Sequence, residues 1–476
     1  MARYNEEFDF DLVVVGCGVA GTAAALSAAE TAKELGQSLR IIILERTSYE
    51  QRGGNSRDTD AYMRMQDEKT MAENFVEEMM AFSGGRSDET YIRTLYEKAP
   101  ETIAWVKEHG VEFDYLPTLF LTSSRPRLLP VGGGRAILDR LAKQSERLGV
   151  QIVYHSTAWR LGIGDDGAIN EIWIRDEDGL TTKVKTKAVI LASGGFQGNP
   201  EMLTRYLGKN AYKLPTIAPG GKSNKGEGIQ MALEIGAKTA GQMDSFHAEP
   251  SDPRSNRGDA AVMIYPYGIL VDQNGRRFVD EGKTTIDEQY EEVARKIFQL
   301  PGHVAYCIID RKMYDIPNYH YAIQTDQDPI QANSIRELAE RINVPADQLE
   351  KTIADYNAAI QPGQFNPLKK DGKRTKGLEI EKSNWANPID EPPFLAYPMQ
   401  CSNVFTFGGI ATDVNGRVLS NDDIPIPGLY AAGEVTGLYH DKYPGGTSVL
   451  RGLVFGRIAG REAVRYVVNK YETVQS

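Results

Sequence analysis

A glycine-rich motif near the N-terminus, GCGVAG, carries the first chemical signal in this chain of 476 residues. It places Gly16, Gly18 and Gly21 between the apolar run FDLVVVG and an alanine-rich segment. In a strand, turn and helix of this kind, the glycines allow a tight turn, close approach to a diphosphate, and packing of the helix on the strand. The free N–H groups at the helix start, with Val19 and Ala20 included in the predicted site, face the anion.

A second apolar run, residues 39–44, ends in Glu45. A carboxylate at the end of this strand accepts hydrogen bonds from ribose hydroxyls in dinucleotide-binding domains. Arg46 follows it and is assigned to the same cofactor site. The two apolar runs and the intervening helix form a β-α-β unit, for which parallel strands are expected.

Three later segments repeat the pattern of small residues at a turn. They are GGNS at 53–56, VILASGGFQGN at 189–199 and GLYAAGEVTG at 428–437. Their small side chains and free amides would let a ring system lie against the backbone. The predicted cofactor contacts in these segments are Gly53, Gly54, Asn55, Ser56, Ala192, Ser193, Gly194, Gly195, Gly433 and Glu434.

Together with NKGEGI, NGRRFVDEG, TFGGIATD and VFGRIAG, these motifs make the chain resemble the fumarate reductase/succinate dehydrogenase flavoprotein family. The resemblance implies an α/β fold with a two-dinucleotide-binding-type, Rossmann-like FAD domain and an inserted α+β capping substrate domain. We expect residues 1–240 to form the first part of the FAD domain, 241–390 the capping domain, and 391–476 the second part of the FAD domain.

The resemblance also implies how FAD is held. Glu434 matches the acid that contacts the ribityl or ribose portion. The helix that begins near Ser448, with Val449 and Leu450, would aim its positive end at the flavin N1/C2 region and favour an anionic reduced flavin. Family members that attach FAD covalently carry a histidine in the GGNS segment, whereas the first histidine here is His109, so the FAD is expected to be non-covalent.

Two departures from the family pattern argue against fumarate reduction. The segment DEGKTTIDEQY has Ile286 or Asp287 where fumarate reducers carry a proton-donating arginine, and HDKYPGGTSVLRG has Tyr443 where an arginine precedes the glycines. The YPGG element resembles the flavin-dependent 3-ketosteroid dehydrogenases. Residues 277–310 resemble tricarballylate dehydrogenase-type enzymes, and both relatives oxidise a CH–CH bond beside an electron-withdrawing group.

Desaturation of this kind removes a proton from the carbon alpha to a carbonyl and a hydride from the beta carbon. Tyr443 would polarise the carbonyl, while amides around Gly445 and Gly446 would hold the developing enolate. A second tyrosine would take the proton, and Tyr290 is the first candidate because it follows RFVDEG in the cap. Its rivals are Tyr265, Tyr267 and Tyr115.

Other side chains are substrate contacts on one interpretation and structural residues on another. His440 matches a substrate-contacting family histidine and is assigned a catalytic role, while His247 is assigned to substrate binding. Arg127 and Arg451 would clamp an anionic substrate. Four further arginines are alternative substrate contacts. The rival interpretation is that they pair with surface acids or form part of the pocket wall. They are Arg57, Arg64, Arg125 and Arg135.

Composition narrows the classes of partner and cofactor that the protein is expected to have. A formal net charge of −11 argues against nucleic acid or an anionic membrane as the main partner. Cys17, Cys307 and Cys401 lack CxxC or CxxCH spacing, so no metal site, haem or iron–sulfur cluster is expected and electrons would leave to an external acceptor. No apolar run reaches 18 residues, and a cytoplasmic location without membrane insertion is expected.

The leading hypothesis is therefore an FAD-dependent dehydrogenase acting on a ketosteroid, a cyclic ketone such as an oxocyclohexane carboxylate, or a tricarballylate-like acid. One alternative is a fumarate or enoate reductase that runs the reverse reaction. The other is a non-catalytic flavoprotein that holds FAD as structure or as a redox sensor. The oligomeric state, the exact substrate and the natural acceptor stay open.

Overall fold

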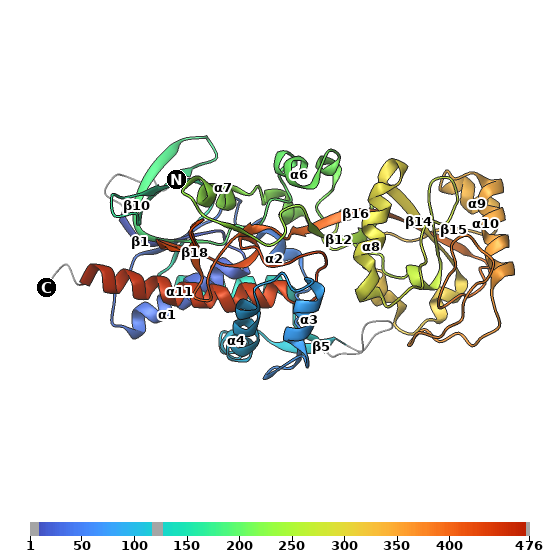
Figure 1. Cartoon of the computed structure of the whole chain (residues 1–476), viewed down its shortest axis with the longest axis horizontal. Helices are drawn as coiled ribbons and strands as arrows, with labels where there is room; N and C mark the ends of the chain where they lie inside the picture. The colour runs from blue at the N-terminus through green and yellow to red at the C-terminus, as the bar shows by residue number, and fades with distance from the viewer. Residues whose placement is uncertain (1–8, 117–126, 473–476) are drawn as a thin grey trace. The chain divides into compact units, whose positions relative to one another are not determined.

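The computed structural model describes residues 9–116 and 127–472, and these divide into two compact units (Figure 1). The first unit contains residues up to 116, residues 126–247, and residues from 404 onward. The second contains residues 248–403. The inserted unit thus begins seven residues after, and ends thirteen residues after, the bounds of 241–390 expected for the cap.

A mainly parallel sheet forms the centre of the first unit. Its strand order is β18-β19-β10-β1-β2-β7, and β8 and β9 extend it by antiparallel pairing next to β10. The strands are β1 (Asp9–Val15), β2 (Ile41–Leu44), β7 (Gln151–Val153), β8 (Thr157–Ile163), β9 (Ile169–Arg175), β10 (Thr181–Leu191), β18 (Arg417–Leu419) and β19 (Pro425–Ala431).

The expected β-α-β unit is confirmed. Residues 12–15 of β1 pair in parallel with residues 41–44 of β2, and α1 (Val19–Glu34) lies between them in the chain. Both strands are rich in β-branched residues and are buried along their length, as expected for a parallel strand covered on both faces. The segment KVKTKAVILAS becomes apolar on both faces towards its end, which predicts a buried parallel strand. This strand is confirmed, because β10 pairs in parallel with β1 and β19.

The long C-terminal helix α11 (Ser448–Glu472) packs directly on α1, beside which it lies in Figure 1. Gly456 and Gly460 of α11 face carbonyl groups of α1: a Cβ atom would lie 2.4 Å from the oxygen of Ala20 and 2.1 Å from that of Ala24, respectively. The contact moves four residues towards the C-terminus in both helices, from Gly456 and Ala20 to Gly460 and Ala24. The two helices therefore run in the same direction. Only glycine permits this backbone-to-backbone approach.

The other elements of the first unit surround this core. The 3.6-residue period of apolar residues from Glu68 to Gly110 predicts helices in this interval. Residues 65–71 instead pair as the short hairpin of β3 and β4, and the first helix starts at Phe75. These elements are α2 (Gly54–Asp58), β3 (Met65–Asp67), β4 (Thr70–Met71), α3 (Phe75–Phe82), α4 (Glu89–Glu108), β5 (Phe113–Leu116), β6 (Arg127–Pro130), α5 (Gly133–Arg147), α6 (Pro200–Leu207), η1 (Ala211–Lys213), η2 (Pro219–Ser223), α7 (Glu227–Glu234), β11 (Thr239–Ala240), β17 (Gly409–Ile410) and η7 (Gly433–Val435).

The second unit is built on an antiparallel sheet of order β12-β16-β14-β13, with β15 paired to β16. Helices α9 and α10 pack with this sheet around a core of aliphatic side chains. The elements are β12 (Phe246–Ser251), η3 (Tyr265–Tyr267), β13 (Ile269–Val271), α8 (Ile286–Gln299), η4 (Pro301–His303), β14 (Val304–Asp310), η5 (Arg311–Asp315), η6 (Tyr319–Ala322), β15 (Ile330–Ala332), α9 (Ile335–Arg341), α10 (Ala346–Ala359) and β16 (Phe394–Thr406).

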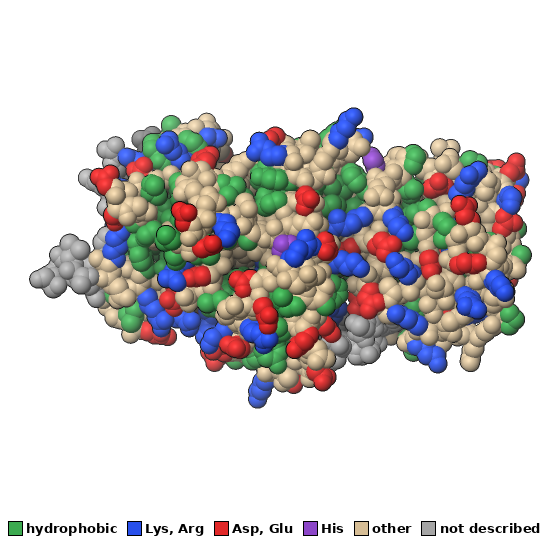
Figure 2. Space-filling view, viewed as in Figure 1, with side chains coloured by type: hydrophobic (Ala, Val, Ile, Leu, Met, Phe, Trp, Pro, Cys, Tyr) green, Lys and Arg blue, Asp and Glu red, His purple; other side chains and the backbone are tan. Residues whose placement is uncertain are grey.

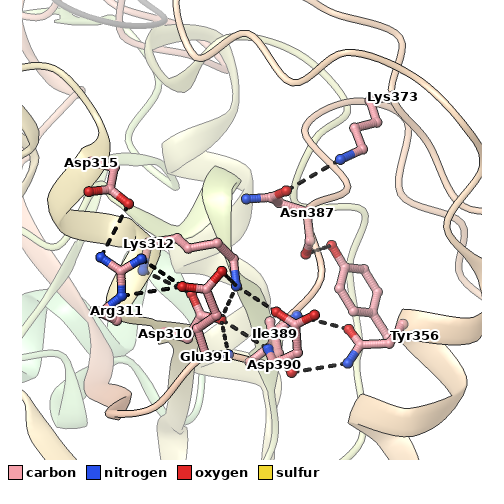
Figure 3. A network of polar contacts seen from close by, with 11 residues as sticks. Asp310, Arg311, Lys312, Asp315, Tyr356, Lys373, Asn387, Ile389, Asp390 and Glu391 are labelled. Atoms are coloured by element: carbon pink, nitrogen blue, oxygen red, sulfur yellow. Dashed lines mark hydrogen bonds and ion pairs between the residues drawn. The ribbon is translucent and has the colours of Figure 1, made fainter.

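A network of ion pairs closes one end of this sheet (Figure 3). Asp310, at the end of β14, is buried and accepts hydrogen bonds from the amides of Asp390 and Glu391 at 2.9 and 3.0 Å. Lys312 bonds to Asp310 and lies 2.7 Å from the Asp390 carboxylate, and Arg311 lies 2.6 Å from that of Glu391. These contacts attach the segment before β16 to the end of β14.

Acidic and basic side chains are interspersed over the face drawn in Figure 2. Within residues 9–116 and 127–472, no helix is both long and apolar enough to cross a membrane.

The contact between α1 and α11 generates a stability prediction. Gly460→Ala and Gly456→Ala should each lower the free energy of unfolding by about 1–3 kcal/mol, because the new methyl group overlaps a carbonyl oxygen. Gly452→Ala is the matched control on the same helix, since its Cβ would make only ordinary contact at 3.6 Å and alanine favours a helix by about 1 kcal/mol. Urea denaturation of the three variants measures this; equal stability of Gly452→Ala and Gly460→Ala would contradict it.

Candidate functional site

The turn between β1 and α1 has the geometry that a diphosphate requires. Gly16 has a φ of +104°, and a Cβ there would lie 2.5 Å from the carbonyl oxygen of Ala192. A Cβ at Gly21 would lie 1.9 Å from the oxygen of Gly16. The buried Glu45 carboxylate accepts a hydrogen bond from the amide of Cys17 at 3.1 Å and so holds the turn to the end of β2.

The GGNS segment lies against this turn. The hydroxyl of Ser56 accepts a hydrogen bond of 3.1 Å from the amide of Val19, the first residue of α1. Asn55 donates to the carbonyl of Val404 at 2.6 Å, while its own amide oxygen is buried without a partner among the described residues. The segments around residues 16–21, 53–56, 192 and 404 are thus brought to one place.

Beside them lies a group of polar side chains, the Glu434 cage, which we define as Glu434, Gln197, Asn224 and Thr406. The carboxylate of Glu434 accepts hydrogen bonds from the amide of Thr406 at 3.0 Å and from the side chains of Gln197 and Asn224 at 3.3 Å each. Burial raises the pKa of Glu434 to about 7, although the donors of Thr406 and Gln197 act in the opposite direction. Gly195 leaves this cage open, because a Cβ there would lie 2.2 Å from the Thr406 hydroxyl and 2.4 Å from the Glu434 carboxylate.

The polar groups at this place fit FAD. Several buried side-chain atoms have no hydrogen-bond partner within the described parts of the chain, which is costly unless a ligand or water supplies one. These atoms are Asn55 Oδ1, Ser193 Oγ, Gln197 Oε1 and Thr216 Oγ1. FAD carries many hydroxyl, carbonyl and ring-nitrogen groups that would pair with them. Sequence reasoning missed Gln197, Asn224 and Thr406 as individual contacts, although each lies in or next to a motif that it singled out.

The start of α11 extends the site beyond the diphosphate turn. Gly452 and Gly456 both lie against Ala20, so α11 begins about five residues, or roughly 8 Å, before the level of the first turn of α1. Both helices present their N-terminal ends, which carry partial positive charge, on the same side. This arrangement suits an elongated ligand with an anion at one helix and an electron-accepting ring at the other.

The YPGG loop leads into α11, and Tyr443 folds back on it. The phenol oxygen of Tyr443 accepts hydrogen bonds of 2.9 Å from the amides of both Thr447 and Ser448, and its hydroxyl donates to the Ser448 side chain at 3.1 Å. The neighbouring Tyr439 hydroxyl pairs with the Thr447 hydroxyl at 2.8 Å. The ring of His247 lies 4.4 Å from that of Tyr443, so two of the candidate residues, from distant segments, are brought together.

Two arginines hold the glycines of this loop. The Arg127 guanidinium lies close to both: a Cβ at Gly445 would be 3.1 Å, and one at Gly446 3.4 Å, from its Nη1 atom. Arg64, which is buried, donates to the carbonyl of Gly445 at 2.8 Å and is ion-paired with Glu78 at 2.5 Å. Arg127 is therefore beside the loop, and its assignment as a substrate contact stays a prediction.

The remaining candidates in the first unit have other surroundings. Arg451 is buried, with its guanidinium on the carbonyls of Gly433 and Thr436 rather than on the loop glycines. His440 is partly buried, and burial together with the charge of Arg86 lowers its pKa. Arg57 donates to the carbonyl of Glu50, Arg135 lies 3.9 Å from the carboxylate of Asp139, and Tyr115 is exposed. Arg125 lies outside the described residues.

The candidate bases of the capping unit differ in their suitability. Tyr265 is fully buried, and burial raises its pKa well above the usual value. Burial also raises the pKa of Tyr267, whose hydroxyl donates to the carbonyl of Pro367 at 2.7 Å. Both phenols are therefore poor proton acceptors near neutral pH. Tyr290 lies on α8 and is largely buried. Across residues 9–116 and 127–472, no cluster of His, Cys, Asp and Glu is arranged to hold a metal.

Comparisons with known proteins show the family to which the chain belongs. The family model described as FAD binding domain matches residues 11–450. The chain is 28% identical to vinyl phenol reductase of Lactiplantibacillus plantarum, over 96% of this chain and 97% of that protein. It is similar in structure to the open conformation of a flavocytochrome c3 fumarate reductase, with a TM-score of 0.80, 24% identity, and coverage of 98% of this chain and 79% of that one. It is also similar to 3-ketosteroid-delta4-(5alpha)-dehydrogenase from Rhodococcus jostii RHA1, with a TM-score of 0.70, 26% identity, and coverage of 97% and 98%.

The raised pKa of Glu434 generates a pH prediction. The FAD-free protein should lose up to about 3 kcal/mol of unfolding free energy as the pH rises from 4.5 to above 7, because the folded state retains a proton that the unfolded state has released. Below pH 4.5 the carboxyl is protonated in both states and this contribution is fully present. Urea denaturation at several pH values, with Glu434→Gln as the control, isolates the effect as the difference between the two proteins. A constant difference across this range would contradict the assignment.

Proposed function

Since the chain belongs to the flavoprotein family described as FAD binding domain, and is an FAD-dependent oxidoreductase acting on CH–CH groups, we propose that it desaturates a CH–CH bond next to a ketone or carboxylate and passes the electrons to an external acceptor. A purely structural or sensory role for FAD is set aside, because the related proteins are oxidoreductases.

The observation that carries the proposal is the hydrogen bonding of Tyr443. Its oxygen accepts from two main-chain amides at the positive end of α11, while its own proton is directed to Ser448. A hydroxyl that accepts two hydrogen bonds is a stronger donor through its remaining proton. We infer that a substrate carbonyl replaces the Ser448 hydroxyl as acceptor, so that the phenol stabilises the negative charge that develops on the carbonyl oxygen.

Arg127 would act on the same oxygen or on a substrate carboxylate. Its guanidinium lies at the glycines of the loop, and Arg64 donates a hydrogen bond to the carbonyl of Gly445. A guanidinium is suited to bidentate binding of a carboxylate. His247, packed against the ring of Tyr443, would form part of the surface that receives the substrate.

Desaturation also needs a group that accepts the proton from the alpha carbon. Tyr290 is proposed for this role, since its rivals in the cap, Tyr265 and Tyr267, are held protonated by burial. The beta carbon gives up a hydride as the alpha carbon loses its proton, so the substrate loses two electrons and gains a C=C bond. Bound FAD supplies the acceptor for the hydride.

The reverse reaction, reduction of a conjugated C=C bond, is the second candidate. It is favoured by the similarity to vinyl phenol reductase over nearly the full length of both chains. Tyr443 would then stabilise the same negative charge, and Tyr290 would donate the proton. The arginine that serves as donor in fumarate reducers has no counterpart at Ile286 or Asp287.

The direction of the reaction is tested by anaerobic mixing of protein and substrate, with flavin absorbance as the readout. The oxidised protein should be bleached by one member of a panel of cyclic ketones, steroids and polycarboxylates. Rapid recovery of colour when dye-reduced protein meets an enoate or a vinyl phenol, without bleaching by any saturated compound, would instead favour the reductase.

Tyr443→Phe should lower turnover at least tenfold while FAD stays bound, because the carbonyl loses its hydrogen-bond donor. Tyr439→Phe is the matched control: it removes a neighbouring buried hydroxyl that pairs with Thr447 but leaves the two amides and the Tyr443 hydroxyl in place. Steady-state kinetics and the flavin spectrum measure both variants. Equal turnover of Tyr443→Phe and the unmodified protein would remove this phenol from the mechanism.

The base is tested by Tyr290→Phe, with Tyr267→Phe as its control in the same unit. Turnover should fall at least tenfold in the first variant and change little in the second. Loss of activity in both, or in neither, would exclude the assignment of Tyr290.

A further inference from the structure

Arg451 occupies a position that is unfavourable for the protein by itself. Its side chain is 2% exposed and lies in the first turn of α11, where its amide donates to the carbonyl of Thr447 at 2.9 Å. The positive end of a helix disfavours a cation in this turn. Among the described residues, no carboxylate lies within ion-pair distance of the guanidinium. Burial of a charge without a partner of opposite sign is costly.

Within residues 9–116 and 127–472, the groups that contact the guanidinium are neutral. Its two terminal nitrogens donate to the carbonyls of Thr436 at 3.3 Å and Gly433 at 3.1 Å, and it lies 4.8 Å from the centre of the Tyr439 ring. Its Nε atom has no partner in the described part of the chain. These contacts fix the position of the charge without neutralising it.

The turn that Arg451 holds belongs to the cofactor site. Gly433 has a φ of +80°, and a Cβ there would lie 2.8 Å from the Cβ of Ala20 in the diphosphate turn. The next residue is Glu434, whose carboxylate is bound in its cage. Arg451 is the charged side chain that acts on Glu434, and the groups that contact this carboxylate directly, from Thr406, Gln197, Asn224 and the Gly195 backbone, are neutral. One positive and one ionisable negative group therefore flank the same turn.

We propose that Arg451 and Glu434 set the reduction potential of bound FAD as two opposed buried charges. Two-electron reduction of a flavin with uptake of one proton leaves a net negative charge on the ring system. The charge of Arg451, added to the positive end of α11, stabilises this negative charge and raises the potential. An ionised Glu434 opposes it and lowers the potential.

This arrangement explains why a costly cation is retained at the helix start, because features that reduce stability are expected at functional sites. It also bears on the direction of the reaction, since a higher potential favours acceptance of electrons from a saturated substrate. The inference rests on FAD binding and not on the identity of the substrate.

Arg451→Gln, compared with Arg451→Lys, tests the contribution of the cation. The holoprotein is titrated anaerobically against reference dyes, and the visible spectrum and the FAD-to-protein ratio establish that the cofactor is retained. Arg451→Gln should shift the two-electron equilibrium at least tenfold towards oxidised flavin, which is about 30 mV. Arg451→Lys should retain most of the original potential. A wild-type potential in FAD-loaded Arg451→Gln would overturn the proposal.

Glu434→Gln tests the opposing charge and serves as the second arm should Arg451→Gln fail to fold. Because the carboxyl is neutral below about pH 7 and ionised above it, this variant should have a higher potential than the unmodified protein at pH 8.5 and the same potential at pH 6. Equal potentials at both pH values would overturn the proposal. Turnover of any carbonyl compound does not enter these measurements, so the proposed reaction can fail while this inference stands.

Discussion

The close approach of α1 and α11 is the constraint on which the site depends. Gly456 and Gly460 bring the backbone of α11 onto the carbonyl groups of Ala20 and Ala24, and any side chain at these positions would separate the helices. Because the two helices are parallel and displaced along their axes, their positive ends lie on one side and at different levels. The diphosphate turn and the YPGG loop are therefore held on the same side of the helix pair.

Polar groups around these helix ends are arranged for a partner that the chain does not itself supply. The Glu434 cage, the unpartnered amide oxygen of Asn55 and the buried charge of Arg451 all reduce stability in the protein alone. A bound dinucleotide would supply hydrogen-bond partners to the polar groups and negative charge to offset that of Arg451. The same groups then act on the bound ring, so the features that bind the cofactor also adjust its chemistry.

The YPGG loop combines main-chain groups with side chains from distant segments. The amides of Thr447 and Ser448 donate to the phenol oxygen of Tyr443, Arg64 donates to the carbonyl of Gly445, and the Arg127 guanidinium lies beside the loop glycines. In the proposed reaction the phenol stabilises the negative charge that develops on a substrate oxygen, which ketones and carboxylates share. Selection of the rest of the substrate is then left to the surrounding aromatic and cationic side chains.

Local sequence determined the elements of the FAD domain and the cofactor itself. The β-branched runs of β1 and β2, the GCGVAG spacing and Glu45 each depend on residues that are close in the chain, so their conformations follow from local preferences and glycine geometry. The hairpin at 65–71 was not anticipated, because its pairing competes with a helical pattern of apolar residues.

Tertiary structure alone decided the partners of the individual side chains. Arg451 follows the loop glycines in the chain and was expected to bind substrate, yet the helix directs it onto the carbonyls of Gly433 and Thr436. Gln197, Asn224 and Thr406 converge on Glu434 from segments separated by up to about 240 residues. Such contacts are set by how the helices pack on the sheet, and burial then shifts the pKa of each group. Neither the contacts nor the burial can be read from the spacing of neighbouring residues in the sequence.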